Sequence, residues 1–526
     1  MKRLYRLIFL FSAGAILSCI FKSNVDAAEA TLIEQDITNL RDSFNTNLGE
    51  EVYAGVSLTE NELNDPNIMG LVTKHFNAVT LGNELKPDAM FGYSNHKCPE
   101  LIAYDFNGEE YIAPKMDYSR AEHMLDYFVK WNEENPDRII KVRGHVLVWH
   151  SQTPEWFFHE NYDKNEPYLT PSEMDKRQEW YIKEVLEHFT GKYEGLFYGW
   201  DVVNEAISDA TGTYRTDAEN SADSLTDDTH GSKSSWWKVY GSNQYIINAF
   251  KYANKYAPSY VELYYNDYNE CNPLKSNGII NLLEDVKAAE GTRIDGMGMQ
   301  GHYDMTQPTG GQVKVAAKRY ADVVGNVSLT ELDLKSSDSY DGSDEEKEKE
   351  YRRQYMKYKE IYQGLSELIE EGVTIRTVTV WGVIDRNSWL QFQNNVGGGA
   401  NGKHKQCPLL FDDNYKAKPL FYALCNEEIP VVAKEETTDS DENEFDISTE
   451  ENNSVESEEA NIDESKLEEI ADESERQSTE VTNSKVADEN ENNSNRYSII
   501  AIIVLLVTSV GLLAIGRKRA NDDKKE

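Results

Sequence analysis

The chain has 526 residues and a formal net charge of −40, from 53 basic and 93 acidic side chains. The charge argues against nucleic acid and anionic lipid headgroups as partners, because both surfaces are negatively charged and bind lysine and arginine side chains. A neutral substrate fits better. The 31 tyrosines and 9 tryptophans permit binding to the apolar faces of sugar rings, although a large core uses the same residues.

The N-terminus has the layout of a secretory signal. Basic residues at Lys2, Arg3 and Arg6 precede the apolar run 7–21, and small residues follow close to Ala30. We therefore exclude residues 1–30 from the fold and expect the rest of the chain to be exported. A lipoprotein signal ending at the cysteine in position 19 is a looser alternative.

From residue 51 to residue 426, short β-rich runs alternate with longer amphipathic stretches, as in βα units around a parallel sheet. The runs expected to be strands are 51–56, 77–80, 139–148, 197–203, 261–265, 296–301, 326–332 and 377–381. The helices expected between them include 121–132, 175–189, 245–256, 278–289 and 346–371. Eight such units predict an α/β fold, a (β/α)8 TIM barrel with enlarged loops, whose active site lies at the carboxyl ends of the strands.

Three connections are longer than such a barrel requires, at 87–115, 208–235 and 386–410. In the first, Asn107-Gly108 between β-forming residues predicts a hairpin with a two-residue turn. The second is rich in Asp, Ser and Thr and is typical of a solvated loop; a calcium site is a weaker alternative, because no ordered ligand spacing is present. The third holds the glycines 397–399, which suit either a mobile flap or a plain surface turn.

The cysteines do not indicate a metal site. Outside the N-terminal apolar run they are Cys98, Cys271, Cys407 and Cys425, and their spacings match no zinc motif. Export would allow a disulfide, and Cys407 with Cys425 is the most plausible pair, although connectivity cannot be read from spacing. We expect no metal and no other cofactor.

The composition changes abruptly after Asn426. The segment that follows is strongly acidic and almost free of aromatic residues, so we predict a disordered stem. Residues 497–516 form an uncharged apolar run long enough to cross a bilayer, and the basic triplet 517–519 places the C-terminal end in the cytoplasm. A buried core helix is the alternative, but a disordered stem offers it no core.

These segments predict a membrane-tethered protein whose barrel lies outside the cell. The expected order is a signal peptide at 1–30, the barrel at 31–428, the stem at 429–496, a transmembrane helix at 497–516 and a cytoplasmic tail at 517–526. The oligomeric state is not indicated by the sequence.

Two apolar β-like runs each carry a glutamate where a barrel has its active site. The run 198–206 delivers Asn204-Glu205 at its end, and the run 326–334 contains Glu331. Hydrolysis of a glycosidic bond requires two such carboxyl groups. Either glutamate alone could be a surface residue at a strand exit, but the two together indicate a catalytic pair.

Short motifs recur near the ends of successive predicted strands. They are Asn83-Glu84-Leu85-Lys86, the runs 143–152 and 200–206, Tyr265-Asn266-Asp267-Tyr268-Asn269, Gln300-Gly301-His302, Thr330-Glu331-Leu332-Asp333, and Trp381-Gly382 with Asp385 and Ser388-Trp389. In this order they resemble the motifs of the family 10 glycoside hydrolases, whose usual activity is endo-β-1,4-xylanase. The resemblance covers the whole expected barrel.

The resemblance implies a role for each matching residue. Glu205 is expected to be the general acid/base and Glu331 the nucleophile of a retaining mechanism, in which two carboxyls lie roughly 5–5.5 Å apart. Asn204 would donate to the 2-hydroxyl of the sugar under attack, while His302 and Asp333 would keep the nucleophile ionised and oriented. The substrate-binding residues implied on the glycone side are Asn83, Lys86, His145, Trp149, Gln300, Trp381 and Trp389.

One position departs from the family pattern. Gly82 stands where the family commonly has Glu, so we expect a contact to a distal sugar hydroxyl to be missing. The implied function is a retaining endo-β-1,4-xylanase that acts on xylan and xylo-oligosaccharides outside the cell. Two alternatives stay open: a cell-surface polysaccharide-binding protein that has lost turnover, and a β-1,4-glucanase, because paired carboxylates do not distinguish xylose from glucose.

Overall fold

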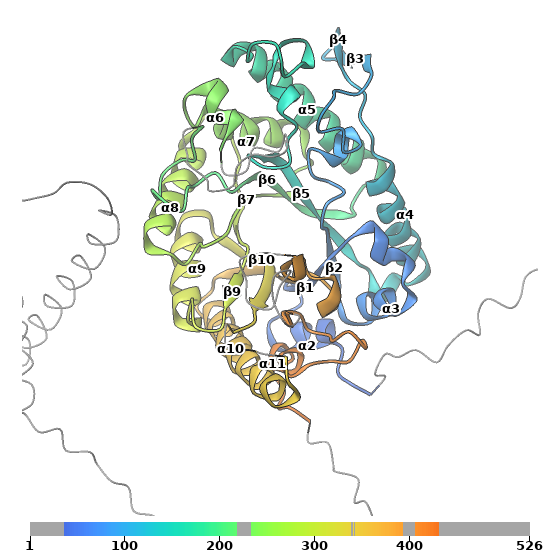
Figure 1. Cartoon of the computed structure of the whole chain (residues 1–526), viewed down its shortest axis with the longest axis vertical. Helices are drawn as coiled ribbons and strands as arrows, with labels where there is room; N and C mark the ends of the chain where they lie inside the picture. Colours follow the sequence, from blue (N-terminus) through green and yellow to red (C-terminus); the bar gives the residue numbers. More distant parts are fainter. Residues whose placement is uncertain (1–35, 218–232, 338–339, 341, 393–405, 431–526) are drawn as a thin grey trace, which may run out of the picture. The chain divides into compact units, whose positions relative to one another are not determined.

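Eight parallel strands close into a ring in the computed structural model, which describes residues 36–217, 233–337, 340, 342–392 and 406–430. The ring strands are β1 (Tyr53–Leu58), β2 (Ala78–Leu81), β5 (Lys141–Trp149), β6 (Phe197–Asn204), β7 (Glu262–Asp267), β8 (Gly296–Met299), β10 (Asn326–Lys335) and β11 (Thr374–Val380). The pairing of β11 with both β1 and β10 closes the ring, and a short strand, β9 (His302–Asp304), extends β10 on one side. The predicted barrel and all of its strands are confirmed (Figure 1).

Helices surround this ring (Figure 1). They are α2 (Leu40–Asn47), α3 (Pro66–His75), α4 (Ser119–Glu134), α5 (Pro171–Lys192), α6 (Ser235–Tyr240), α7 (Gln244–Tyr256), α8 (Pro273–Ala288), α9 (Gly310–Val324), α10 (Asp344–Glu370) and α11 (Pro419–Leu424). Short 3-10 helices lie at Glu60–Asn64, Ala89–Phe91, Pro136–Arg138, Glu155–Phe158, Glu160–Tyr162, Asp385–Asn387 and Trp389–Phe392. All five predicted helices are present, as α4, α5, α7, α8 and α10, whereas α2, α3, α6, α9 and α11 were not predicted.

The long first connection contains the predicted hairpin. Strands β3 (Leu101–Phe106) and β4 (Glu109–Pro114) pair antiparallel, with Phe106 opposite Glu109. Asn107 and Gly108 form the turn with φ values of 58° and 83°. A left-handed conformation at both central residues is what the asparagine-glycine pair favours.

A buried ion pair lies inside the barrel. Arg143 on β5 contacts Asp201 on β6 at 2.5 Å, and both side chains are shielded from solvent. His145 pairs with the same carboxylate, its Nδ1 2.9 Å from Asp201 Oδ2. Gly144, between Arg143 and His145 in the chain, leaves space for the indole of Trp200, because a Cβ atom on Gly144 would lie 2.1 Å from that ring. This packing sets the position of His145 on β5.

The first helix lies at the amino-terminal ends of the strands. Arg41 on α2 donates to the carbonyl oxygens of Phe76 and Ile139, both at 3.2 Å and both just before a ring strand begins. Ser43 donates to the carbonyl oxygen of Cys425, directly after α11, at 2.7 Å. The first and last described helices therefore meet on the side of the barrel away from the carboxyl ends of the strands.

The disulfide considered from the sequence is not formed, because all four cysteines among the described residues are free thiols. Cys407 instead lies with its Sγ 3.3 Å from Ser336 Oγ, and Cys425 is buried after α11. The predicted signal, the stem from residue 431 onward, the apolar run 497–516, the tail 517–526 and the glycines 397–399 lie outside the described residues. Within the described ranges, no helix combines the length and apolar character needed to span a membrane.

Candidate active site

A cavity of about 720 Å³ opens at the carboxyl ends of the strands. Eleven of the predicted site residues line it, namely Asn83, Lys86, His145, Trp149, Asn204, Glu205, Gln300, His302, Glu331, Trp381 and Trp389. The twelfth, Asp333, lies behind His302. The cavity wall also contains residues to which sequence reasoning gave no role, among them Glu62, Gln152, Tyr268, Asn269, Asn387 and Phe392.

Glu331 is buried on β10, with only 5% of its surface exposed. Its Oε1 accepts a hydrogen bond from Asn266 Nδ2 at 2.8 Å, and its Oε2 lies 3.4 Å from His302 Nε2. Burial alone would raise the pKa of Glu331, but the hydrogen bond from His302, the charges of His145 and His302, and the Asn266 amide lower that pKa below its usual value. The site therefore keeps this carboxylate ionised.

His302 is held in place from behind. Its Nδ1 lies 2.9 Å from Asp333 Oδ1, and Asp333 Oδ2 accepts from the indole nitrogen of Trp389 at 2.7 Å. Burial by itself would lower the pKa of His302, but the carboxylates of Asp333 and Glu331 outweigh it and raise that pKa well above its usual value. An imidazolium fixed by Asp333 therefore faces Glu331.

Glu205 has a different environment. Its Oε1 accepts from Asn204 Nδ2 at 3.0 Å and from Gln300 Nε2 at 2.9 Å, while its Oε2 accepts from the indole nitrogen of Trp149 at 2.9 Å. All three donors are neutral. The carboxyl is oriented by these hydrogen bonds, and His150 Nδ1 lies 4.0 Å from its Oε2. Among the described residues, no Lys or Arg side chain forms an ion pair with it.

The backbone at Glu205 turns sharply at the end of β6, with a φ of 56°. That left-handed conformation is unfavourable for a side chain with a Cβ, and the neighbouring chain holds it. The Glu205 amide donates to the carbonyl of Asn266 at 2.9 Å, and its carbonyl accepts from Arg215 Nε at 3.0 Å.

Asn266 is a site residue to which sequence reasoning gave no role. It links Glu331 to Asn204, the neighbour of Glu205. Its Nδ2 donates both to Glu331 Oε1 and, at 3.0 Å, to Asn204 Oδ1, while its Oδ1 accepts from Thr330 Oγ1 at 2.6 Å. Gly298 leaves space for this amide, since a Cβ there would lie 2.3 Å from Asn266 Oδ1. The only sequence signal was its place in a motif at a strand end.

Polar groups and indoles share the rest of the wall. Lys86 Nζ donates to Asn83 Oδ1 at 3.0 Å and lies 5.2 Å from the centre of the Trp149 ring. Burial lowers the pKa of Lys86, although the carboxylates of Glu331 and its neighbours oppose this. The His145 and Trp381 rings meet edge to face at 5.6 Å. Such a surface can bind hydroxyl groups and cover the apolar faces of sugar rings.

No metal centre is visible in the described part of the chain, where no three His, Cys, Asp or Glu side chains are grouped to hold an ion. Most of the loop considered for calcium, at residues 218–232, lies outside that part.

Comparison with known proteins identifies relatives of this barrel. Residues 40–427 match the family model described as Glycosyl hydrolase family 10. The chain is 34% identical over 379 residues to Endo-1,4-beta-xylanase Y of Acetivibrio thermocellus, which is 71% of this chain and 31% of that protein. It is 33% identical over 387 residues to Endo-1,4-beta-xylanase A of Thermotoga maritima, 72% of this chain and 30% of the relative. The chain thus spans about a third of the length of these relatives.

Solved structures share the fold. The N-terminal endo-1,4-beta-D-xylanase 10B modules of Clostridium thermocellum, complexed with xylohexaose, are 30% identical with a TM-score of 0.58, over 74% of this chain and 67% of that one. The intracellular xylanase of Thermoanaerobacterium saccharolyticum is 29% identical with a TM-score of 0.57, over 74% of this chain and 99% of that one. The similarity extends over most of the barrel.

Proposed function

Because the chain belongs to glycosyl hydrolase family 10, we propose that it is an endo-β-1,4-xylanase that cleaves internal bonds of xylan with retention of configuration. The observation that carries this proposal is the pair of glutamates in one cavity with unlike surroundings. Glu331 is held ionised by His302 and Asn266, whereas Glu205 is held by neutral donors. The names of the relatives, and the xylohexaose bound to one of the solved structures, support xylan as the substrate.

In the first step, Glu331 attacks the anomeric carbon while Glu205 gives its proton to the departing sugar oxygen. The C–O bond to the leaving group breaks as the bond to Glu331 forms. In the second step, Glu205 takes a proton from water, whose oxygen attacks the same carbon and releases Glu331. The carboxylate of Glu331 carries a negative charge beside Glu205 before the first step, and esterification of Glu331 removes that charge before the second.

The remaining wall residues bind the polymer in this proposal. Asn204, which contacts both Glu205 and Asn266, donates to the 2-hydroxyl of the sugar under attack. The other binding residues are those implied by the family resemblance, and they supply hydroxyl contacts and indole walls. They are Asn83, Lys86, His145, Trp149, Gln300, Trp381 and Trp389.

The proposed activity is tested by incubating the full chain with xylan and, separately, with a β-1,4-glucan, and measuring new reducing ends. Release from xylan, with much slower release from the glucan, is expected. Faster release from the glucan would favour a glucanase. A folded protein that binds xylan but releases nothing would favour a polysaccharide-binding protein.

Replacing His302 by glutamine should move the acid limb of activity to higher pH. In the wild type His302 helps to lower the pKa of Glu331, so the nucleophile stays ionised as the pH falls below the usual carboxyl range. Without the imidazolium, burial raises the pKa of Glu331, which is then protonated at higher pH. The pH profile of kcat/KM on an aryl β-xylobioside measures the shift.

His123→Gln is the matched control, because His123 contacts Glu60 at 3.1 Å on the surface, away from the cavity. Its profile should match that of the wild type. An acid limb that stays in place in His302→Gln would contradict the role of His302.

We further propose that the enzyme acts outside the cell, held by the apolar segment 497–516. The predicted signal at 1–30 and this segment in the sequence support the proposal. Deletion of residues 497–526 should release active enzyme into the medium, measured as xylanase activity in the supernatant. Activity of the truncated chain that stays with the membrane fraction would contradict the anchor.

A further inference from the structure

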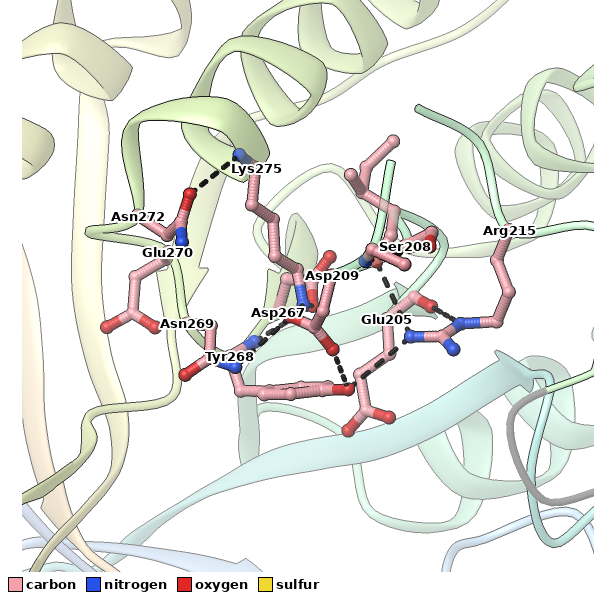
Figure 2. Close-up of polar contacts among 12 residues, drawn as sticks. Glu205, Ser208, Asp209, Arg215, Asp267, Tyr268, Asn269, Glu270, Asn272 and Lys275 are labelled. Atoms are coloured by element: carbon pink, nitrogen blue, oxygen red, sulfur yellow. Dashed lines mark hydrogen bonds and ion pairs between the residues drawn. The ribbon is translucent and has the colours of Figure 1, made fainter. Parts of the chain in front are cut away.

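Two residues of the loop between β7 and α8, Tyr268 and Asn269, line the cavity beside Glu205. Figure 2 shows the Tyr268 ring lying close to Glu205, with the charged side chains of Asp209 and Lys275 above it. Burial, and next the negative charge of Glu205, raise the pKa of Tyr268. The two side chains are thus near the oxygen atoms that exchange a proton with the substrate.

A single carboxylate, that of Asp209, holds both of these residues. Its Oδ2 accepts from the Tyr268 hydroxyl, and its Oδ1 accepts from Asn269 Nδ2 at 3.1 Å. The same Oδ1 accepts from Lys275 Nζ at 2.8 Å. Asp209 follows Glu205 by four positions in the chain, so it ties the loop after β6 to the loop after β7 (Figure 2).

Lys275 supports this arrangement from inside the protein, and Asp209, Lys275 and Asp267 together form a clamp around Tyr268. The side chain of Lys275 is 1% exposed, and its Nζ lies 2.9 Å from the fully buried Asp267 and 3.6 Å from the centre of the Tyr268 ring. The Tyr268 amide also donates to Asp267 Oδ1 at 2.9 Å. A buried ammonium needs such partners, and its attraction to the ring face is strongest where water is absent. The ring is therefore fixed at its face and at its hydroxyl.

The clamp is connected to the backbone of Glu205. Arg215 lies with Nη2 3.5 Å from the Tyr268 hydroxyl and donates through Nε to the Glu205 carbonyl at 3.0 Å. The loop from Glu205 to Arg215 packs closely on α8, because a Cβ atom on Gly278 would lie 2.1 Å from the carbonyl oxygen of Gly212. Glu205 and Tyr268 are thus placed relative to each other by the same set of contacts.

We propose that Asp209, supported by Lys275, is a positioning residue for the sugar on the leaving-group side, because it holds Tyr268 and Asn269 beside Glu205. The inference rests on the proposed function, in which Glu205 protonates the oxygen of the departing sugar. Tyr268 and Asn269, on the loop after β7, form the cavity wall next to Glu205, and this wall then contacts the departing sugar. Loosening the wall weakens productive binding of an oligosaccharide, but it spares a substrate whose leaving group is not a sugar.

The test compares Asp209→Ala with the wild type, in the full chain, on xylohexaose and on 4-nitrophenyl β-xylobioside. Asp209 is 39% exposed, so its removal leaves the buried Lys275–Asp267 pair in place. We expect kcat/KM on xylohexaose to fall about tenfold, the size that the loss of a hydrogen bond to a charged group produces. On the aryl glycoside the change should stay below about twofold.

Asp285→Ala is the matched control. Asp285 on α8 accepts from the Tyr214 hydroxyl at 2.6 Å and from Asn243 at 3.0 Å, so it also ties the loop after β6 through a tyrosine, but outside the cavity. Asp285→Ala should leave the ratio of kcat/KM on xylohexaose to kcat/KM on the aryl glycoside unchanged. If Asp285→Ala changes the ratio as Asp209→Ala does, general loosening of the loop explains the effect and the proposal is wrong.

A double variant tests whether Asp209 acts through the tyrosine hydroxyl. If it does, kcat/KM on xylohexaose falls no further in the double variant Asp209→Ala with Tyr268→Phe than in the more impaired of the two single variants. The proposal is wrong if the fold-losses of the two single variants multiply in the double variant. It is also wrong if Asp209→Ala lowers kcat/KM equally on both substrates, or leaves kcat/KM on xylohexaose unchanged. A wild-type chain that cleaves neither substrate would overturn the proposed function as well, which sets that outcome apart from the others.

Discussion

Replacing Glu331 by glutamine is expected to lower xylan hydrolysis by about 10⁴-fold or more. The amide keeps the shape of the side chain but cannot form the covalent bond to the anomeric carbon. It can still accept from Asn266 through its oxygen, so the β10 backbone and the cavity should stay as they are. Reducing-end release measures the loss, while circular dichroism and binding to insoluble xylan show that fold and cleft survive.

Glu350→Gln is the control for this change, because Glu350 is equally buried and accepts from Ser337 and Arg353, away from the cavity. That variant should lose stability without losing turnover by the folded fraction. If a folded Glu331→Gln variant cleaves xylan at a rate near that of the wild type, Glu331 is not the nucleophile.

Replacing Glu205 by alanine should separate the two chemical steps. Xylan hydrolysis should fall by about 10²- to 10⁴-fold, because the departing sugar oxygen needs a proton. An aryl xylobioside with an acidic phenol as leaving group needs none, so its first step should remain fast. The second step lacks its base, and the glycosyl-enzyme on Glu331 should accumulate. A burst of released phenol and a mass increase on the Glu331 peptide are the measurements.

The same mechanism fixes the configuration of the first product of the wild type. Two displacements at one carbon leave the released sugar in the β form, which NMR can detect before the anomers equilibrate. An α product would show a single displacement and would rule out Glu331 as the nucleophile. Equal slowing of the xylan and aryl substrates in Glu205→Ala would count against Glu205 as the proton donor.

The barrel could be predicted because its strands are short, apolar and separated by turn residues, so their number and order are visible in the sequence. The turn at Asn107-Gly108 was equally clear, since few sequences favour left-handed conformations twice in succession. Of the five helices that were not predicted, two contain residues that weaken a helical pattern. Helix α3 carries Pro66 and an internal Gly70, and α9 begins with two glycines, residues that weaken a helical pattern.

The site was less fully visible. Its glutamates lie at strand ends, where a barrel places its chemistry, and the family motifs named most of their neighbours. Asn266 and Asp209 act through contacts with residues distant in the sequence, and no spacing predicts such contacts. The proposed pairing of Cys407 with Cys425 failed for the same reason, because near neighbours in the chain need not face each other in the fold.

The meeting of the first and last described helices has a practical consequence. Thr38 and Glu427 are joined by a hydrogen bond of 2.5 Å, and Ser43 contacts Cys425, so the two ends of the described barrel lie side by side. Both are on the side where the strands begin, whereas the cavity opens where they finish. A solid support or a fused carrier protein attached at either end would therefore leave the entrance unobstructed, and a linker between the ends would make a cyclic enzyme without crossing it.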